Sequence, residues 1–255
     1  MTIRTTKRSP GEVTWMDLST PDLVAAKKFY QQVFGWAYQD TGQAFGHYNM
    51  AQTQQHNAAG MAQMDSGAQM PSAWTIYFSS DDAAADAQRV KALGGQVLMD
   101  AMVVGDTGAM AICADPTGAV FGLWQAKEHI GANIVGEHGS MAWWEVNTRD
   151  LVAARDFYNK LFDLTPHKME GMEYYTMQRG EEMICGVLQM DENLANIPPH
   201  WMGYFGVDDT DAAVERATAA GGIVGVPAFD MPYGRMAVIV DPFGAAFSIV
   251  QPPQA

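Results

Sequence analysis

The chain has 255 residues, of which 48% are hydrophobic, and a formal net charge of −14 from 15 basic and 29 acidic side chains. Such an acidic surface repels phosphate backbones and anionic lipids, so we expect neither nucleic acid nor a membrane as a partner. No run of 18 apolar residues and no secretory signal is found, and the only two cysteines, Cys113 and Cys185, lie in apolar segments. We therefore expect buried free thiols and a cytoplasmic protein.

The beginning of the chain predicts a tail, a strand and a helix. Residues 1–10 are polar and carry three cations with no apolar stretch behind them, so we predict a disordered tail. A short alternating strand follows over 13–18. Apolar residues then recur at three- and four-residue spacing over 22–34, which indicates an amphipathic helix. Thr20-Pro21-Asp22 supplies its N-terminal cap and a proline in its first turn.

The following segments repeat this order of elements. Strand-like segments lie at 45–50 and 58–64, and a strand at 74–79 then leads into a helix over 83–93 that stops at Gly94-Gly95. Three further strands are predicted near 97–99, 110–114 and 120–124. Residues 127–139 have few strong apolar residues and are predicted to form a linker.

The second half of the chain repeats the first. Residues 15–30 return as 143–158, and the turn sequence Asp115-Pro116-Thr117-Gly118-Ala119 returns as Asp241-Pro242-Phe243-Gly244-Ala245. The offsets are 128 and 126 residues, so only small insertions separate the copies. Repetition at this period predicts a duplicated domain. We place the first domain at 11–126 and the second at 140–252, each built from two βαβββ-like modules.

The motifs and their order resemble the vicinal oxygen chelate superfamily, the glyoxalase, bleomycin-resistance and extradiol-dioxygenase group. The resemblance covers roughly residues 11–251. Its carriers are the Asp-Leu-x-x-Ala-x-x-Phe-Tyr helix starts at Asp22 and Asp150, the helices that end in Gly-Gly, and the Asp-Pro-x-Gly-Ala-x-Phe hairpins. The resemblance implies an α+β fold in which tandem βαβββ modules form two half-barrel glyoxalase-like domains. The concave face of each would hold a small ligand or a metal.

The metal-ligand positions of that family carry unsuitable residues here. Catalytic members usually place His, Gln or Glu on the first strand of each module and Glu on the last strand. Carried over by motif, these positions fall at Trp15, Thr75 and Gly122 in one copy, and at Trp143, Met202 and Ser248 in the other. None of these side chains is a competent metal ligand. We therefore expect no metal and no other cofactor.

Side-chain alternation along the strands predicts what the concave faces contain instead. Residues two apart share a face, so Asp17 lies beside Trp15 and Glu145 beside Trp143. The two carboxylates are the candidate catalytic residues, as acid–base groups whose pKa the cavity raises. The candidate ligand-binding residues are Trp15, Thr75, Tyr77, Trp124, Trp143, Met202, Tyr204 and Arg235. The tryptophans could equally fill the half barrels as core, and the carboxylates could be structural.

Three functions remain open from the sequence. The first is a metal-free protein that binds a small, largely apolar or aromatic molecule in its concave cavity. The second is a lyase or isomerase of the glyoxalase type that uses Asp17 or Glu145 as acid–base. The third is a degenerate family member that acts as an interaction module. We expect either a monomer whose domains pair within the chain or a homodimer.

Overall fold

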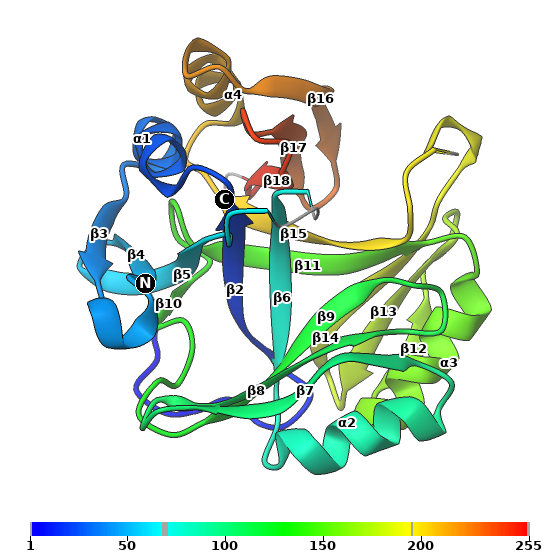
Figure 1. Cartoon of the computed structure of the whole chain (residues 1–255). Coiled ribbons are helices and arrows are strands. Elements are labelled where there is room, and N and C mark those ends of the chain that lie inside the picture. Colours follow the sequence, from blue (N-terminus) through cyan, green and yellow to red (C-terminus); the bar gives the residue numbers. More distant parts are fainter. Residues whose placement is uncertain (1, 68–70, 195, 254–255) are drawn as a thin grey trace.

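The computed structural model describes residues 2–67, 71–194 and 196–253, and it contains two curved sheets, one in each half of the chain (Figure 1). The first sheet has the order β3-β4-β5-β2-β6-β9-β8-β7. Its strands are β2 (Val13–Thr20), β3 (Ala37–Asp40), β4 (Asn49–Thr53), β5 (His56–Gln63), β6 (Ala73–Ser79), β7 (Gln96–Val104), β8 (Gly108–Ala114) and β9 (Val120–Ala126). Helices α1 (Leu23–Phe34) and α2 (Ala83–Ala92) belong to the same half.

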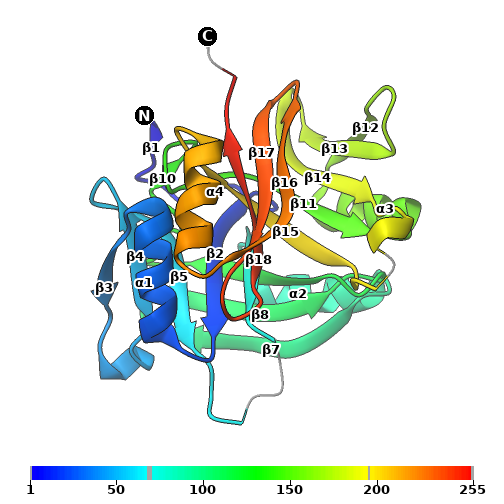
Figure 2. The ribbon, with the colours of Figure 1, turned by 90° about the horizontal axis from the view of Figure 1, so that it is seen from above.

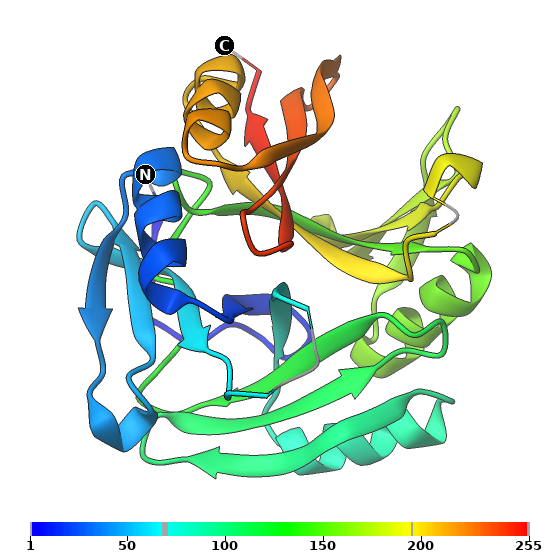
Figure 3. The ribbon, with the colours of Figure 1, turned by 45° about the horizontal axis from the view of Figure 1, so that its top comes forward.

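The second sheet repeats this topology in the order β12-β13-β14-β11-β15-β18-β17-β16. Its strands are β11 (Met141–Thr148), β12 (Thr165–Lys168), β13 (Tyr174–Arg179), β14 (Glu182–Gln189), β15 (His200–Gly206), β16 (Ile223–Met231), β17 (Gly234–Val240) and β18 (Ala246–Gln251). Helices α3 (Leu151–Phe162) and α4 (Thr210–Ala219) complete it. The predicted α+β fold with a duplicated arrangement of βαβββ modules is confirmed. In Figure 3 the first half lies at the left and below, and the second half lies above and to the right.

The two long helices begin and end as their sequences dictate. The Asp22 side chain accepts a hydrogen bond from the Ala25 amide, and α1 ends at Gly35, whose φ of 71° is left-handed. Asp150 caps α3 in the same way through the Ala153 amide. These caps satisfy amides that have no partner within the helix. The apolar stripe of each helix is buried, as its spacing predicted.

The halves are joined through the faces of β6 and β15 that point away from the concave sides. Trp74 of β6 lies 5.1 Å from the Phe205 ring of β15, and Phe78 lies 5.2 Å from Trp201. Helix α1 packs beside α4 of the opposite half (Figure 2). One continuous aromatic core therefore spans both halves.

Reciprocal hydrogen bonds cross the same interface. Tyr30 of α1 donates to Asp241 at 3.0 Å, and Tyr158 of α3 donates to Asp115 at 3.0 Å. Each aspartate also accepts amide hydrogen bonds within its own Asp-Pro-x-Gly turn. A helix of each half therefore forms a hydrogen bond to the Asp-Pro-x-Gly turn of the other half, and these bonds link the two copies of the repeat.

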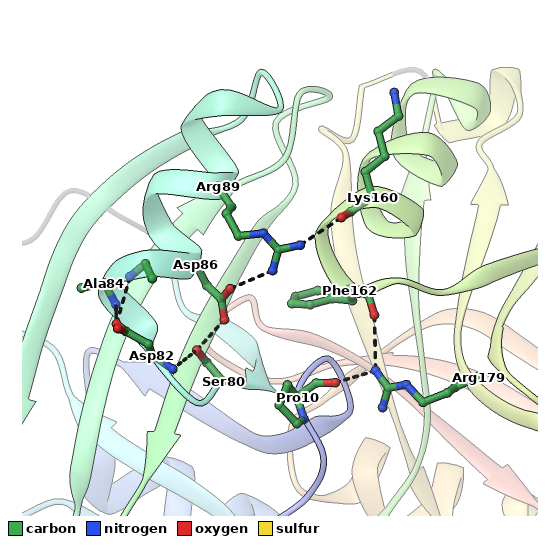
Figure 4. A network of polar contacts seen from close by, with 10 residues as sticks. Pro10, Ser80, Asp82, Ala84, Asp86, Arg89, Lys160, Phe162 and Arg179 are labelled. Carbon is green, nitrogen blue, oxygen red and sulfur yellow. Dashed lines mark hydrogen bonds and ion pairs between the residues drawn. The ribbon is translucent and has the colours of Figure 1, made fainter.

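The N-terminal segment packs against the fold. Strand β1 (Thr2–Ile3) pairs with β10 (Ile134–Val135) of the linker, and the Arg8 side chain is only 6% exposed. Lys7 forms an ion pair with Asp81. Arg179 donates to the Pro10 carbonyl, as Figure 4 shows. This packed segment differs from the disordered tail that its composition favoured, because Asp81 and Arg179, which are distant in the sequence, supply it with contacts.

The cysteines and the helices of the structure agree with the sequence. Cys113 and Cys185 are buried free thiols, as expected. Within the described residues, no helix combines the length and apolar character needed to cross a membrane.

Candidate functional site

The predicted site residues of the first half meet at the centre of its sheet. Trp15 of β2 is paired in register with Tyr77 of β6, and Asp17 with Thr75. On the other side of β2, Asp17 is paired with Gly60 of β5. The Asp17 carboxylate is therefore surrounded on the sheet by aromatic and small side chains.

A chain of hydrogen bonds ends on the Asp17 carboxylate. The indole N–H of Trp15 donates to the Tyr48 hydroxyl at 2.7 Å, and that hydroxyl donates to Asp17 Oδ2 at 3.1 Å. The Tyr77 hydroxyl is also placed to donate to Asp17. Because the indole N–H occupies the Tyr48 oxygen as an acceptor, the phenolic proton is directed at the carboxylate.

The second half contains the same cluster with glutamate in place of aspartate. Trp143 donates to the Tyr174 hydroxyl at 3.0 Å, and Tyr204 donates to Glu145 Oε1 at 2.7 Å. Tyr174 also stands beside this carboxylate. The Glu145 side chain is one methylene longer than Asp17, and its residue is only 6% exposed whereas Asp17 is partly exposed.

Glycines make room for the tyrosine rings. A Cβ atom on Gly60 would lie 1.7 Å from the Tyr48 hydroxyl oxygen, and one on Gly186 would lie 1.9 Å from that of Tyr174. A Cβ on Gly122 of β9 would lie 2.1 Å from the Tyr77 ring. Larger residues at these positions would displace the phenols, so the glycines and tyrosines form a matched set.

Burial changes the acid–base behaviour of both carboxyl groups. It raises the pKa of Asp17 to about 6, although the hydrogen bonds from Tyr48 and Tyr77 oppose the shift. Burial likewise raises the pKa of Glu145. No Lys, Arg or His forms an ion pair with either group in the part of the chain that the structure describes. Each carboxylate is therefore stabilised only by neutral donors.

A comparison with protein families agrees with this architecture. The sequence model of the Glyoxalase/Bleomycin resistance protein/Dioxygenase superfamily matches residues 12–123 and again 140–249. The chain belongs to this superfamily.

Two relatives match the glyoxalase-superfamily chain along nearly its whole length. The Mycobacterium tuberculosis protein named "Putative glyoxylase CFP32" is 42% identical over 250 residues, which are 95% of each chain. The anthracycline biosynthesis protein DnrV of Streptomyces peucetius is 36% identical over 265 residues, covering 96% of this chain and 95% of the relative.

Solved structures of the superfamily share the fold at low sequence identity. The Mn(II)-bound glyoxalase from Novosphingobium aromaticivorans has a TM-score of 0.65 at 14% identity, covering 95% of this chain and 82% of that chain. The 2,3-dioxygenase LapB from Pseudomonas sp. KL28 has a TM-score of 0.64 at 12% identity, covering 95% of this chain and 92% of that chain.

The superfamily's metal does not fit the concave faces of this member. The last-strand ligand position of the first half is Gly122, and the Tyr77 ring fills the space above it. In the second half the corresponding Ser248 is paired with Tyr204. Among the described residues, no group of three or more His, Cys, Asp or Glu side chains could hold a metal ion. One carboxylate surrounded by protonated phenols is a poor donor set for a divalent cation.

The remaining predicted residues divide between the two sides of the sheets. Trp124 lies on the concave side, and Met202 is paired with Glu145 and buried. Arg235 points to the side covered by α4, where Asp211 and Asp230 bind its guanidinium at 2.9 and 3.0 Å. It lies apart from the Glu145 cluster, and its role in binding a ligand stays a prediction.

Sequence reasoning missed three residues of the clusters. Tyr48, which directly precedes β4, reaches Asp17, and Tyr174 of β13 reaches Glu145. His129 of the linker lies against Trp15. The tyrosines had a signal, because they recur at the offset of 126 residues that Gly60 and Gly186 also show. His129 had none, because its segment has no periodic pattern.

Proposed function

We propose that the protein binds a small aromatic molecule that carries a cationic or hydrogen-bond-donating group, and that it does so on a concave face without a metal. The observation that carries the proposal is a carboxylate set in an aromatic wall with only neutral donors around it, present in both halves. A ligand that supplies the missing positive charge or donor would complete this arrangement.

The aromatic side chains of the concave faces suit a ligand that combines an aromatic ring with a cationic group. Indole and phenol faces attract ammonium groups through their quadrupoles, with about 0.5–2 kcal/mol per contact. The same rings offer a large apolar area to an aromatic skeleton. The net charge of −14 adds a long-range attraction for cations.

The similarity to DnrV supports an aromatic ligand. That relative is named as an anthracycline biosynthesis protein and is 36% identical to this chain. Anthracyclines combine a planar ring system with an amino sugar, which are the two features that the concave faces would recognise. We therefore propose ligands of this chemical class, without assigning one compound.

A matched pair of probes tests the proposal. An anthracycline glycoside, which carries the amine, and its neutral aglycone are titrated into the protein, and binding is followed by quenching of tryptophan fluorescence and by calorimetry. We expect the glycoside to bind at least about tenfold more tightly, which corresponds to about 1.4 kcal/mol for the charged pair.

Substitutions identify the groups responsible for this preference. The double variant Asp17→Asn with Glu145→Gln should bind glycoside and aglycone equally, because neither face then carries a charge. Asp100→Asn is the control, since it removes one negative charge from a side chain that is 86% exposed. If neither probe binds, the protein is not a receptor for this class, and an interaction module with filled faces becomes the better account.

A second function is favoured by the acid–base behaviour of Asp17. A partly exposed carboxyl group with a pKa of about 6 could take a proton from a carbon beside a carbonyl group, while Tyr77 or Tyr48 donates a hydrogen bond. This would be a lyase or isomerase of the glyoxalase type. The test is conversion of a glutathione hemithioacetal in the presence of a chelator. Activity that survives chelation and is lost in Asp17→Asn supports it, and chelator-sensitive activity contradicts it.

A further inference from the structure

The linker places an aromatic side chain on the concave face of the first half. The His129 ring lies edge-on to Trp15, with ring centroids 4.5 Å apart and an interplanar angle of 87°. It also lies 5.5 Å from Trp124, whose indole N–H donates to the His129 carbonyl at 2.8 Å. Both tryptophans are on the face that carries Asp17. A histidine from outside the repeat therefore sits between two of the predicted ligand-binding residues.

Backbone contacts hold this histidine in place. The His129 amide donates to the Thr107 carbonyl at 3.1 Å, and the Ala132 amide donates to Thr14 at 2.9 Å. Gly131 has a φ of 93°, and a Cβ there would lie 2.2 Å from the Thr14 carbonyl oxygen. Glycine is required for this close approach of the linker backbone to β2, and the approach places His129 against the sheet.

The imidazole itself makes an unusual set of contacts. Its Nε2 atom is buried and has no hydrogen-bond partner in the structure. Burial lowers the pKa of His129 to about 4, so the ring is neutral near pH 7. The ring is therefore held through its flat apolar faces and edges, as a bound aromatic molecule would be.

The aromatic face of the second half differs in its exposure, in one wall residue and in its ring contacts. Trp15 and Tyr77 are 3% and 5% exposed, whereas their counterparts Trp143 and Tyr204 are both partly exposed. Val250 occupies the place of Trp124, which removes most of an indole ring from the wall. Within the described residues, the ring contact of Trp143 is with its own neighbour Trp144. Among the described residues, the equivalent aromatic wall is thus more open to solvent than the wall of the first half.

We infer that the His129 ring fills a ring-binding position on the aromatic face of the first half. In the second half the equivalent position is open, and the aromatic ring of a ligand binds there. The inference rests on the proposed function and refines it. One ligand binds per chain, its ring lies on Trp143 and Tyr204, and planar rings of about the size of imidazole or larger are the favoured class.

Imidazole is the direct probe of the first face. His129→Gly should lower the melting temperature by about 4 °C, since buried ring contacts are lost. Millimolar imidazole at about pH 8, where it is neutral, should restore most of that loss. His138→Gly is the control, because His138 lies in the same linker but pairs with Asp208 at 3.3 Å. The control should gain nothing from imidazole.

A second variant covers the case in which His129→Gly does not fold. His129→Phe keeps a flat ring of similar size, so it should fold, keep its melting temperature within about 2 °C and ignore imidazole. The inference is overturned if imidazole stabilises wild type or His129→Phe as much as His129→Gly. It is also overturned if imidazole stabilises His129→Gly no more than His138→Gly.

Ligand stoichiometry separates this inference from the proposed function. The anthracycline glycoside should bind wild type at one per chain and His129→Gly at two per chain. Glu145→Gln, but not Asp17→Asn, should weaken the wild-type site about tenfold. Two sites in wild type would overturn the inference and leave the proposed function standing. If no glycoside binds at all, the proposed function fails, and the imidazole experiment still decides the role of His129.

Discussion

The concave faces of the two halves keep the same cluster of Trp, two Tyr and a carboxylate, yet they differ in what surrounds it. In the first half Asp17 is partly exposed, and the walls beside it are covered by the linker through His129. In the second half Glu145 is 6% exposed, while Trp143 and Tyr204 beside it are partly open to solvent. Duplication thus preserved the polar centre of the face and changed access to it.

The difference between the halves indicates which residues determine ligand specificity. The hydrogen bonds that orient the carboxylates come from tyrosines present in both halves. The features that differ are one methylene of the acid, the replacement of Trp124 by Val250 and the histidine from the linker. We expect the shared cluster to set which chemical group is recognised, and the changed rim to set which half recognises it.

The largest predicted effect concerns the glycine that lies under a tyrosine ring in only one half. Gly122→Ala should destabilise the protein by about 3 kcal/mol or more, because its Cβ would lie 2.1 Å from the Tyr77 ring. Ser248→Ala, at the equivalent position, should cost less than about 1 kcal/mol. Denaturant unfolding measures both. A cost below about 1 kcal/mol for Gly122→Ala would show that the Tyr77 ring does not fill the space above Gly122, contrary to the structure.

The next effect is a pH dependence that Asp17 imposes on stability. Its pKa is about 6 in the folded protein and about 3.9 in an unfolded chain, so folding favours the protonated form. That stabilisation is fully present below about pH 4 and is lost as the pH rises through 6. Two pK units correspond to about 3 kcal/mol, which partial exposure reduces to about 2 kcal/mol.

The neutral variant Asp17→Asn isolates this effect. It should be more stable than wild type at pH 7 by about 2 kcal/mol, and the difference should vanish near pH 4. Glu145→Gln should change stability in the same direction, because burial also raises the pKa of Glu145. A wild-type protein that gains stability relative to Asp17→Asn between pH 4 and 7 would contradict the assigned environment.

The smallest predicted effect tests the symmetry of the interface between the halves. Tyr30→Phe leaves the Trp74 indole N–H and one oxygen of Asp241 without this partner, which should cost about 1–2 kcal/mol. Tyr158→Phe should cost the same, because Trp201 and Asp115 repeat the arrangement. Tyr233→Phe, on a residue that is 52% exposed, is the control. Unequal costs for the first two would mean that the halves are not locked reciprocally.

Local patterns predict most of the fold but only part of the site. Strand alternation correctly places Trp15, Asp17 and Tyr77 on one face of the sheet. Trp15 and Asp17 are two residues apart in β2, and Tyr77 is the partner of Trp15 in the adjacent strand β6. The short strand β3 escaped prediction because Ala37–Asp40 is polar, mostly exposed and lies at a sheet edge. Tyr48 is marked only by its recurrence as Tyr174 at the repeat offset, which does not show that its hydroxyl reaches Asp17. The contact of His129 with Trp15 depends on the path of the linker, for which the sequence has no periodic signal.

The central claim is that a concave face with an unpaired carboxylate binds an aromatic amine without a metal. A crystal structure of the wild-type protein with an anthracycline glycoside tests it most directly. We predict ring density against Trp143 and Tyr204, with His129 still between Trp15 and Trp124 in the first half. Glycoside bound away from both concave faces, or a metal ion bound beside Asp17 or Glu145, would contradict the claim.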